Sequence, residues 1–143
     1  MQFQLLTLTG VKFDGEASEI SLRTASGQIA ILPHHEPLTA IVVAGPVVVR
    51  TKGAKSDAYA SFGGLLDVSP DRVRLLADEA EHADDLIHDE ITAALEKARV
   101  LKAEAKSKHE LMRADELIGR HSVRLEVVRL RRRHHHPKEP RLH

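Results

Sequence analysis

Cysteine is absent from this chain of 143 residues, which excludes disulfide bonds, thiolate metal sites and cysteine nucleophiles. Tryptophan is absent too, and three phenylalanines and one tyrosine are the only aromatic residues. A packed core must therefore be built from leucine, isoleucine, valine and alanine. Few aromatic rings are left on which nucleic-acid bases could stack.

Net charge and long apolar runs are also lacking. The formal net charge is zero at pH 7, so no global field would attract nucleic acid or acidic lipid. No run approaches the roughly 20 apolar residues of a membrane-spanning helix. The first residues lack the basic start and the apolar stretch of a secretion signal. We therefore expect a soluble protein with no direct membrane insertion, whose link to any membrane passes through partners.

The first part of the chain, up to residue 83, has the composition of a β domain. Residues 18–24 alternate apolar and polar side chains, which is the period-two pattern of a half-buried strand. Several short segments of this kind, separated by glycines and turn signals, are typical of a sandwich. We expect strands at residues 2–8, 18–24, 27–32, 38–43, 45–51, 57–62, 65–68 and 72–76.

From residue 84 the pattern becomes helical. No glycine or proline occurs up to Ala105, and apolar residues from Ile87 onward recur at steps of three and four. This spacing predicts a helix at about residues 84–106 with an alanine-rich apolar face. A small-residue face of this kind lets a partner helix approach closely.

A second helix is predicted at residues 108–133. Ser107 precedes Glu110 by three residues, which matches a capping box. Leu111, Leu117 and other apolar residues then continue the helical period. The fold class is thus α+β in two parts: an N-terminal antiparallel β-sandwich at 1–83, and a C-terminal antiparallel α-helical hairpin at 84–133. Residues 134–143 hold two prolines and no apolar stripe, so we expect a disordered tail there, including its three histidines.

Four sequence segments indicate a protein family more specifically than composition does, because they occur together in a particular order. Together they resemble the hallmarks of the epsilon subunit of rotary, proton-translocating ATP synthases, over residues 2 to about 106. In this resemblance the first segment corresponds to a turn near the start, and the last two correspond to strands. The segments are FDGEA at 13–17, SGQIAILPHHEPLTA at 26–40, FGGLLDV at 62–68 and RVRLLADEAE at 72–81.

The resemblance implies a non-catalytic rotor subunit. The sandwich would lie at the foot of the central stalk, against the gamma subunit and the membrane ring of c subunits, and would couple proton transport to ATP synthesis. The helical hairpin, when extended, would reach the catalytic alpha/beta head and inhibit ATP hydrolysis. The chain would lie at the cytoplasmic face of the cell inner membrane, peripheral through its complex.

The sequence departs from the family at the start of the first helix. Many members carry an acid and an arginine there that are tied to ATP binding, and Ile87 and Glu90 take these positions. A guanidinium that could hold phosphate is thus replaced by a carboxylate that repels it. We therefore predict no ATP site of that kind and no other cofactor. Saturable micromolar binding in a nucleotide titration would contradict this prediction.

The loop between Pro33 and Pro37 is the main candidate interface. Adjacent histidines rarely converge on one metal ion, so a metal site at His34 and His35 is a poor interpretation. A surface loop and a protein interface remain, and we favour the interface. At Gly27 and Gln28 a simple turn role is favoured over a functional one. The resemblance assigns a rotor interface to Gly27, Gln28, His34, His35, Glu36 and Pro37.

Basic residues are concentrated at the C-terminus, where residues 109–143 hold nine basic and five acidic side chains. One interpretation is a solvated helix face, which is what charge runs usually are. The other is a contact with an acidic surface of the catalytic head. The candidate residues for this inhibitory contact are Arg120, Arg124 and Arg129.

Two other functions compete with the rotor subunit. A small nucleic-acid-binding module could use the basic C-terminal helix, although the zero net charge and the few aromatics disfavour it. An enzyme is the second alternative, but the sequence has no Ser-His-Asp signature and no metal motif. Gly63 and Gly64 lack the spacing and the following lysine of a phosphate loop, and we read them as a bulge or a close backbone approach.

Overall fold

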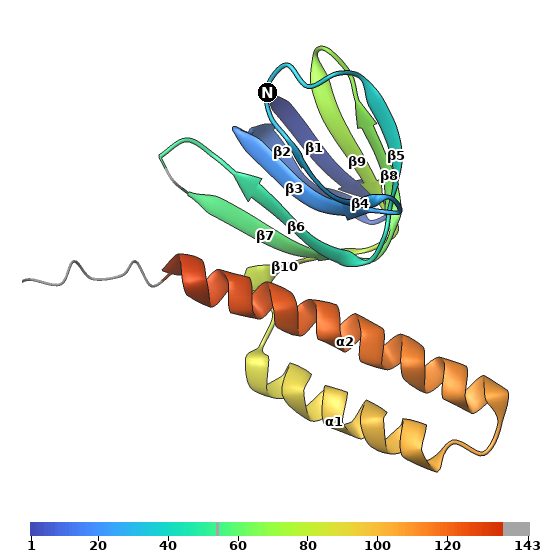
Figure 1. Cartoon of the computed structure of the whole chain (residues 1–143). Coiled ribbons are helices and arrows are strands. Elements are labelled where there is room, and N and C mark those ends of the chain that lie inside the picture. The colour runs from blue at the N-terminus through green and yellow to red at the C-terminus, as the bar shows by residue number, and fades with distance from the viewer. Residues whose placement is uncertain (54, 136–143) are drawn as a thin grey trace, which may run out of the picture.

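A computed structural model describes residues 1–53 and 55–135 of the chain (Figure 1). A sandwich of strands lies on one side and two long helices lie on the other, with the second helix next to the strands. The two-part fold expected from the sequence is confirmed. The strands are β1 Gln2–Thr7, β2 Gly10–Glu16, β3 Glu19–Thr24, β4 Gly27–Ile31, β5 Leu38–Val42, β6 Gly45–Arg50, β7 Ser56–Ser61, β8 Gly64–Val68, β9 Arg72–Ala77 and β10 Ala80–His82.

The strands form one continuous sheet that folds over on itself. Its order is β10-β7-β6-β3-β5-β8-β9-β1-β2, and β4 pairs with β3 outside this path. The pairings are antiparallel except that of β1 with β9, which is parallel. The long connection from β1 to β9 is consistent with a parallel pair, since such strands cannot be joined by a tight hairpin.

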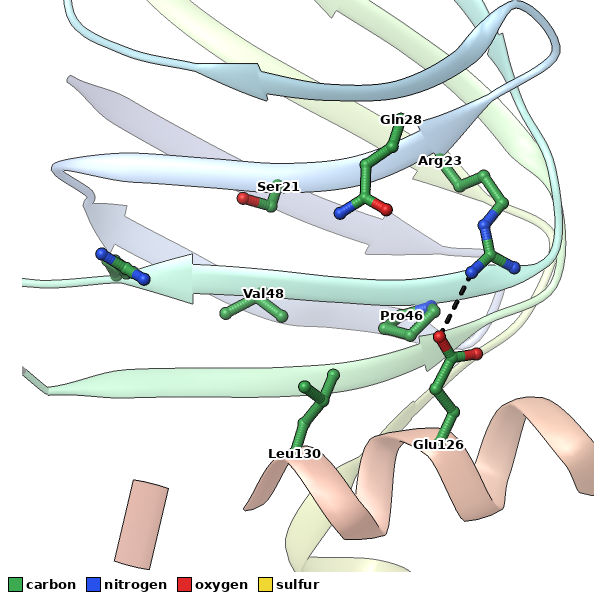
Figure 2. A pocket seen from close by; sticks show the side chains of 8 residues that line it. Ser21, Arg23, Gln28, Pro46, Val48, Glu126 and Leu130 are labelled. Atoms are coloured by element: carbon green, nitrogen blue, oxygen red, sulfur yellow. Dashed lines mark hydrogen bonds and ion pairs between the residues drawn. The ribbon is translucent and has the colours of Figure 1, made fainter. Parts of the chain in front are cut away.

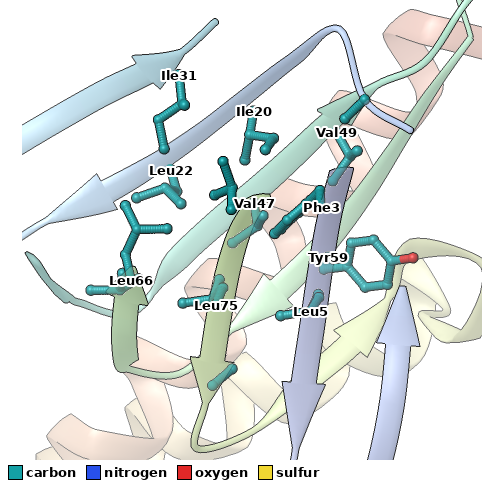
Figure 3. Packing of buried hydrophobic residues seen from close by; sticks show 14 of the residues in the cluster. Phe3, Leu5, Ile20, Leu22, Ile31, Val47, Val49, Tyr59, Leu66 and Leu75 are labelled. Atoms are coloured by element: carbon teal, nitrogen blue, oxygen red, sulfur yellow. The ribbon is translucent and has the colours of Figure 1, made fainter. Parts of the chain in front are cut away.

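The core lies between the two layers of this sheet (Figure 3). Side chains of β1, β8 and β9 from one layer meet those of β3 and β6 from the other, as the period-two patterns require. Leucine, isoleucine and valine dominate, which fits the scarcity of aromatic residues. Fully buried members of this cluster are Phe3, Leu5, Ile20, Leu22, Ile31, Val47, Val49, Leu66 and Leu75.

Two strands were not foreseen, and one expectation was wrong. Residues 13–17 were expected to form a turn, but residues 10–16 form strand β2, which pairs with β1 along its length. The strand lies at the end of the sheet and most of its side chains are exposed, so it has little apolar alternation to reveal it. Strand β10 has three residues, which is too short for a periodic pattern.

Gly64 begins β8 where two backbones come close together. Its φ is +150°, and a methyl group on its Cα would overlap the carbonyl oxygen of Leu76 on the neighbouring strand β9. The preceding Gly63 has a φ of +87°. A close backbone approach at this glycine pair was expected from the sequence and is confirmed.

The helical hairpin consists of α1 His88–Glu104 and α2 Lys108–His135, preceded by a short 3₁₀ helix, η1, at Ala83–Asp85. The side chain of Ser107 accepts a hydrogen bond from the Glu110 amide at 3.1 Å. The Glu110 carboxylate accepts one from the amide of Lys106 at 2.9 Å, one residue before the position that a capping box usually uses. The second helix therefore starts where the sequence predicted. Residues 136–143, most of the expected tail, lie outside the described residues.

The buried face of α2 is only partly the predicted one. Leu111 and Leu117 were expected on the apolar face, but they are 39% and 37% exposed. Burial is concentrated further along, at Val123 and Val127, which pack in a second cluster with Phe62. This cluster joins α2 to the end of the sandwich near β7, and α2 also packs against α1.

Candidate partner interfaces

The loop that follows β4 presents the predicted histidines at the surface. His34 has a φ of +68°, a left-handed conformation, and its side chain is exposed. The amide of His35 donates to the carbonyl of Leu32 at 3.1 Å, and its Nδ1 lies 2.7 Å from the Glu36 carbonyl. These local bonds fix the loop, with Glu36 and Pro37 exposed beside the histidines. The loop is a formed surface feature, as a contact site requires.

Gly27 and Gln28 lie at the opposite end of β4. Gly27 has a φ of +122°, which explains the glycine, and its carbonyl accepts a bond from the Thr24 hydroxyl at 2.8 Å. The exposed Gln28 pairs across the sheet with Arg23 and lines a groove beside α2 (Figure 2). Since all of β4 separates them from the histidine loop, the six predicted interface residues form two sites, not one.

Two of the candidate arginines on α2 contact the sandwich itself. The Nε and Nη2 atoms of Arg124 donate to the carboxylate of Glu81 at 2.9 and 2.6 Å, and Arg120 pairs with Glu79. Both guanidinium groups also lie over the ring of Phe62, at 4.2 Å for Arg120 and 5.3 Å for Arg124. We call these five residues the docking contact, because they hold α2 against the end of the sheet.

The docking contact changes the interpretation of the arginines on the basic C-terminal helix. Arg120 and Arg124 are 26% and 19% exposed, so the interpretation as a solvated face is wrong for these two side chains. Arg129 is exposed. Sequence reasoning missed Phe62, Glu79 and Glu81, since their partners on α2 lie more than 40 residues further along the chain. No local pattern reports a contact over that separation.

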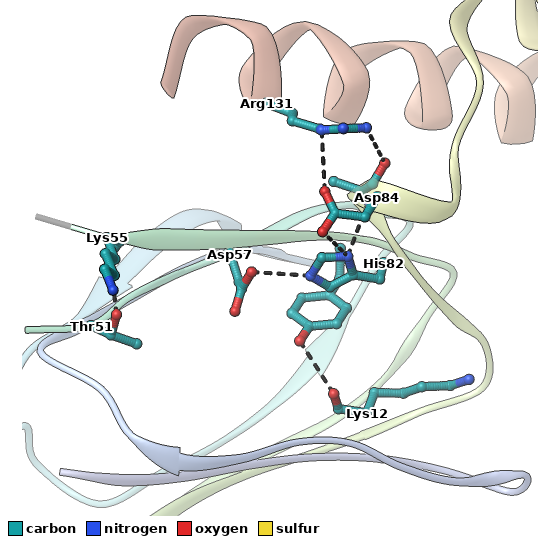
Figure 4. A network of polar contacts seen from close by, with 9 residues as sticks. Lys12, Thr51, Lys55, Asp57, His82, Asp84 and Arg131 are labelled. Atoms are coloured by element: carbon teal, nitrogen blue, oxygen red, sulfur yellow. Dashed lines mark hydrogen bonds and ion pairs between the residues drawn. The ribbon is translucent and has the colours of Figure 1, made fainter. Parts of the chain in front are cut away.

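A second polar cluster lies where the chain leaves the sandwich (Figure 4). The Nε2 of His82 lies 3.0 Å from Asp57, and its Nδ1 accepts the amide of Asp84 at 3.0 Å, which caps η1. Asp84 in turn pairs with Arg131 of α2 at 3.2 Å. Tyr59 is buried, with its ring against the imidazole of His82. Its burial raises the pKa of the phenol to about 12, and the negative charges of Asp57 and Asp84 add to the effect. The cluster ties the hairpin to the sandwich near the connection between them.

The outer face of the sheet carries a row of apolar side chains. Five residues sit directly opposite one another on five neighbouring strands, so they share one face. Four are well exposed, from 44% at Leu65 to 64% at Ile41, and Leu6 is half-buried. We call this set the outer apolar row. From β2 to β5 its members are Val11, Leu6, Leu76, Leu65 and Ile41.

The outer apolar row was not predicted, although the sequence contains adjacent apolar residues that indicate it. Leu65 and Leu76 each stand beside a buried leucine, Leu66 and Leu75, so these strands are apolar on both faces. Continuous apolar runs indicate strands that are covered on both sides. The neighbouring row on the same face is polar and includes Asp67, paired across the sheet with Arg74. An exposed apolar row with a polar border is typical of a protein contact.

Several expected absences can be compared with the part of the chain that the structure describes. Residues 1–53 and 55–131, whose side chains the structure describes, contain no group of three or more histidine or acidic side chains placed to hold a metal ion. Over the same residues, neither helix is both long and apolar enough to cross a bilayer. Ile87 and Glu90, at which the sequence was expected to lack an ATP site, are exposed at the start of α1.

Comparison with known proteins agrees with this architecture. The chain is 34% identical to the ATP synthase epsilon chain of Herpetosiphon aurantiacus, over 92% of this chain and 96% of that one. It is 32% identical to the epsilon chain of Halalkalibacterium halodurans, over 90% and 96%. The nucleic-acid alternative finds no support among these relatives.

Solved structures with the same fold come from ATP synthases. A chain in the cryo-EM structure of the Euglena gracilis mitochondrial ATP synthase, OSCP/F1/c-ring, matches with a TM-score of 0.72 at 23% identity, covering 94% of this chain and 80% of that one. A chain of the Tetrahymena thermophila mitochondrial ATP synthase central stalk and c-ring matches with a TM-score of 0.54 at 11% identity, covering 92% and 95%. The family model for the ATP synthase delta/epsilon chain β-sandwich domain matches residues 1–83. The chain therefore belongs to the ATP synthase delta/epsilon chain family, among its epsilon chains.

Proposed function

We propose that the chain works as the non-catalytic central-stalk subunit of a proton-translocating ATP synthase and transmits torque through packed surfaces. The observation that carries this proposal is the outer apolar row, which crosses five strands on a rigid sheet. A rotor subunit needs such a surface, because it must stay fixed to its neighbours while the complex turns.

The outer apolar row would face the gamma subunit. Its exposed side chains offer apolar area whose burial stabilises a complex by roughly 25 cal/mol per Å² before the costs of association. Asp67 and Arg74 in the bordering row would stay at the wetter rim of the contact. Such an arrangement favours a lasting contact over a transient one.

The histidine loop would face the membrane ring of c subunits. His34, His35, Glu36 and Pro37 project from a loop that local hydrogen bonds already hold in shape, so little order has to be gained on binding. Gly27 and Gln28, at the other end of β4, would contribute a separate, smaller contact. The chain would then be peripheral, held through its complex at the cytoplasmic face of the inner membrane.

The hairpin would exist in a docked and an extended state. In the docked state Arg120 and Arg124 are engaged with Glu79 and Glu81. In the extended state the same arginines, together with Arg129, would be free to contact an acidic surface of the alpha/beta head and block ATP hydrolysis. A ligand or partner shifts this equilibrium only as far as it binds one state better than the other.

A pull-down from native membranes tests the proposed function. The full chain is immobilised, mixed with detergent-solubilised membranes, washed, and the bound proteins are identified by mass spectrometry. We expect the gamma subunit and the c subunit among the retained proteins. Retention of neither, with the chain folded by circular dichroism, would overturn the proposal.

A further inference from the structure

His121 of α2 makes a hydrogen bond that is possible in only one protonation state. Its Nδ1 lies 3.2 Å from Nη1 of Arg124, the arginine whose other nitrogens hold Glu81. A guanidinium has donors and no acceptor. The imidazole must therefore accept this bond at Nδ1, which requires a neutral ring with its proton on Nε2.

Protonation of His121 would disturb the docking contact in two ways. It would set an N–H of the imidazolium against an N–H of Arg124, so the hydrogen bond would be lost. It would also place a positive charge beside Arg124 and Arg120, which are already cationic and share the ring of Phe62. In the undocked state the hairpin would leave Glu81 and Phe62, and the imidazole could take up a proton in water.

We propose that His121 makes the docking of the helical hairpin dependent on pH, so that acidification releases α2 from the sandwich. The proposal assigns to this residue a regulatory role in the docked state described above. It rests on the proposed function only in assuming that the hairpin can leave the sandwich.

The surroundings of His121 determine the sign of the effect. Burial lowers the pKa of its imidazole, Arg124 and Arg120 lower it further, and Glu81 of β10 acts in the opposite direction. Glu79, the remaining charged group of the docking contact, is paired with Arg120. Because the docked pKa lies below the ordinary value of about 6.5, docking is at full strength above that pH and weakens as the pH falls through it.

A fluorescence experiment on the isolated full chain tests this proposal. The chain has no cysteine, so Thr39→Cys and Glu116→Cys, at exposed positions on β5 and α2, give specific sites for a donor and an acceptor dye. Energy transfer then reports the docked fraction. Between about pH 7.5 and 5.5 we expect the docking equilibrium constant to fall several-fold, with a ceiling of about tenfold for one imidazole.

Two further variants isolate His121 from the other histidines. His121→Gln keeps a hydrogen-bond acceptor toward Arg124 and stays neutral, so it should remain docked and lose most of the pH dependence. His109→Gln, at an exposed position in the first turn of α2, is the matched control and should titrate like the parent. Docking that does not change with pH in the parent, or an unchanged pH dependence in His121→Gln, would overturn the proposal.

An NMR titration of the native chain gives an independent answer if His121→Gln does not fold. The imidazole of His121 should titrate at a lower pH in the native chain than in the chain unfolded by denaturant. An equal or higher pKa for His121 would overturn the proposal. Neither measurement needs an ATP synthase, so a failed pull-down would leave this result standing, and the reverse also holds.

Discussion

Arg124 of α2 donates two hydrogen bonds to the carboxylate of Glu81 of β10, from Nε to Oε2 at 2.9 Å and from Nη2 to Oε1 at 2.6 Å. This planar, two-point geometry is the strongest arrangement available to an arginine and a carboxylate. The two side chains are 19% and 28% exposed, so solvent screens the pair less than an ordinary surface ion pair. This pair therefore fixes the position of Arg124 on the sandwich, beside the other members of the docking contact.

Glu81→Gln should weaken the docking of α2 while leaving the sandwich folded. Loss of the charged acceptor should cost about 1 to 3 kcal/mol of docking free energy, because one partly buried guanidinium remains without its counterion. Energy transfer between the labels on β5 and α2 measures this change. Hydrogen exchange of α2 in the unlabelled chain is an alternative measurement. Its matched surface control is Glu116→Gln. Unchanged exchange in Glu81→Gln would contradict the assignment.

Leu65→Ser should weaken binding to the stalk without unfolding the chain. The side chain is 44% exposed, so its loss should change the free energy of unfolding by less than about 0.5 kcal/mol. If Leu65 lies at the centre of a buried contact, binding should weaken by about 2 kcal/mol or more, which is roughly 30-fold. The measurement is the affinity for ATP synthase depleted of this subunit. Leu117→Ser, an exposed leucine on α2 away from the row, should bind normally.

Tyr59 should make the stability of the sandwich fall at high pH. Its hydroxyl donates to the carbonyl of Lys12 at 3.2 Å, and the pKa of the phenol is raised to about 12. The unfolded chain would ionise near pH 10. The stabilisation is therefore complete below about pH 10 and is lost as the pH rises through about 12.

The absorbance of tyrosinate checks this prediction cleanly, because Tyr59 is the one tyrosine in a chain without tryptophan. The native chain should titrate well above the chain in denaturant. Tyr59→Phe should remove the absorbance change and flatten the stability profile over this range. Identical titration of folded and unfolded chains would rule out the buried position of the phenol.

Gly64→Ala should destabilise the sandwich by more than about 2 kcal/mol. The substitution combines an unfavourable φ of +150° with overlap against the Leu76 carbonyl. Gly119→Ala is the opposite case, since the added methyl group meets nothing within 4 Å on helix α2. It should stabilise the chain by about 0.5 to 1 kcal/mol, through better helix propensity. Thermal unfolding of the two variants would show the predicted opposite shifts, and shifts of the same sign would refute the argument.

The general fold could be predicted because local patterns carry it. The alternation of side chains in residues 18–24 displays the period of a strand within seven residues, and the hydrogen bond between Ser107 and Glu110 spans three. Strand β2 was missed for the same reason, since an edge strand with exposed side chains has no alternation to display.

The interfaces were harder to predict because they depend on contacts that are distant in sequence. Nothing near Arg124 indicates that its partner is Glu81, 43 residues earlier. Likewise, Leu65 and Leu76 become neighbours only once β8 and β9 are paired in register. Resemblance to the epsilon subunit supplied the family and the fold, while the partners of individual side chains required coordinates.

The length of α2 gives the hairpin a mechanical property. With 28 residues the helix is about 42 Å long, and the contacts with the sandwich described above lie from Arg120 to Arg131, beyond its first three turns. These first turns, with α1 beside them, project as an arm that is fixed at one end. A sideways force at the free tip of this arm would therefore act with leverage on the anchored end. A neighbouring protein that pushes on the tip could detach the helix from the sandwich without touching the arginines.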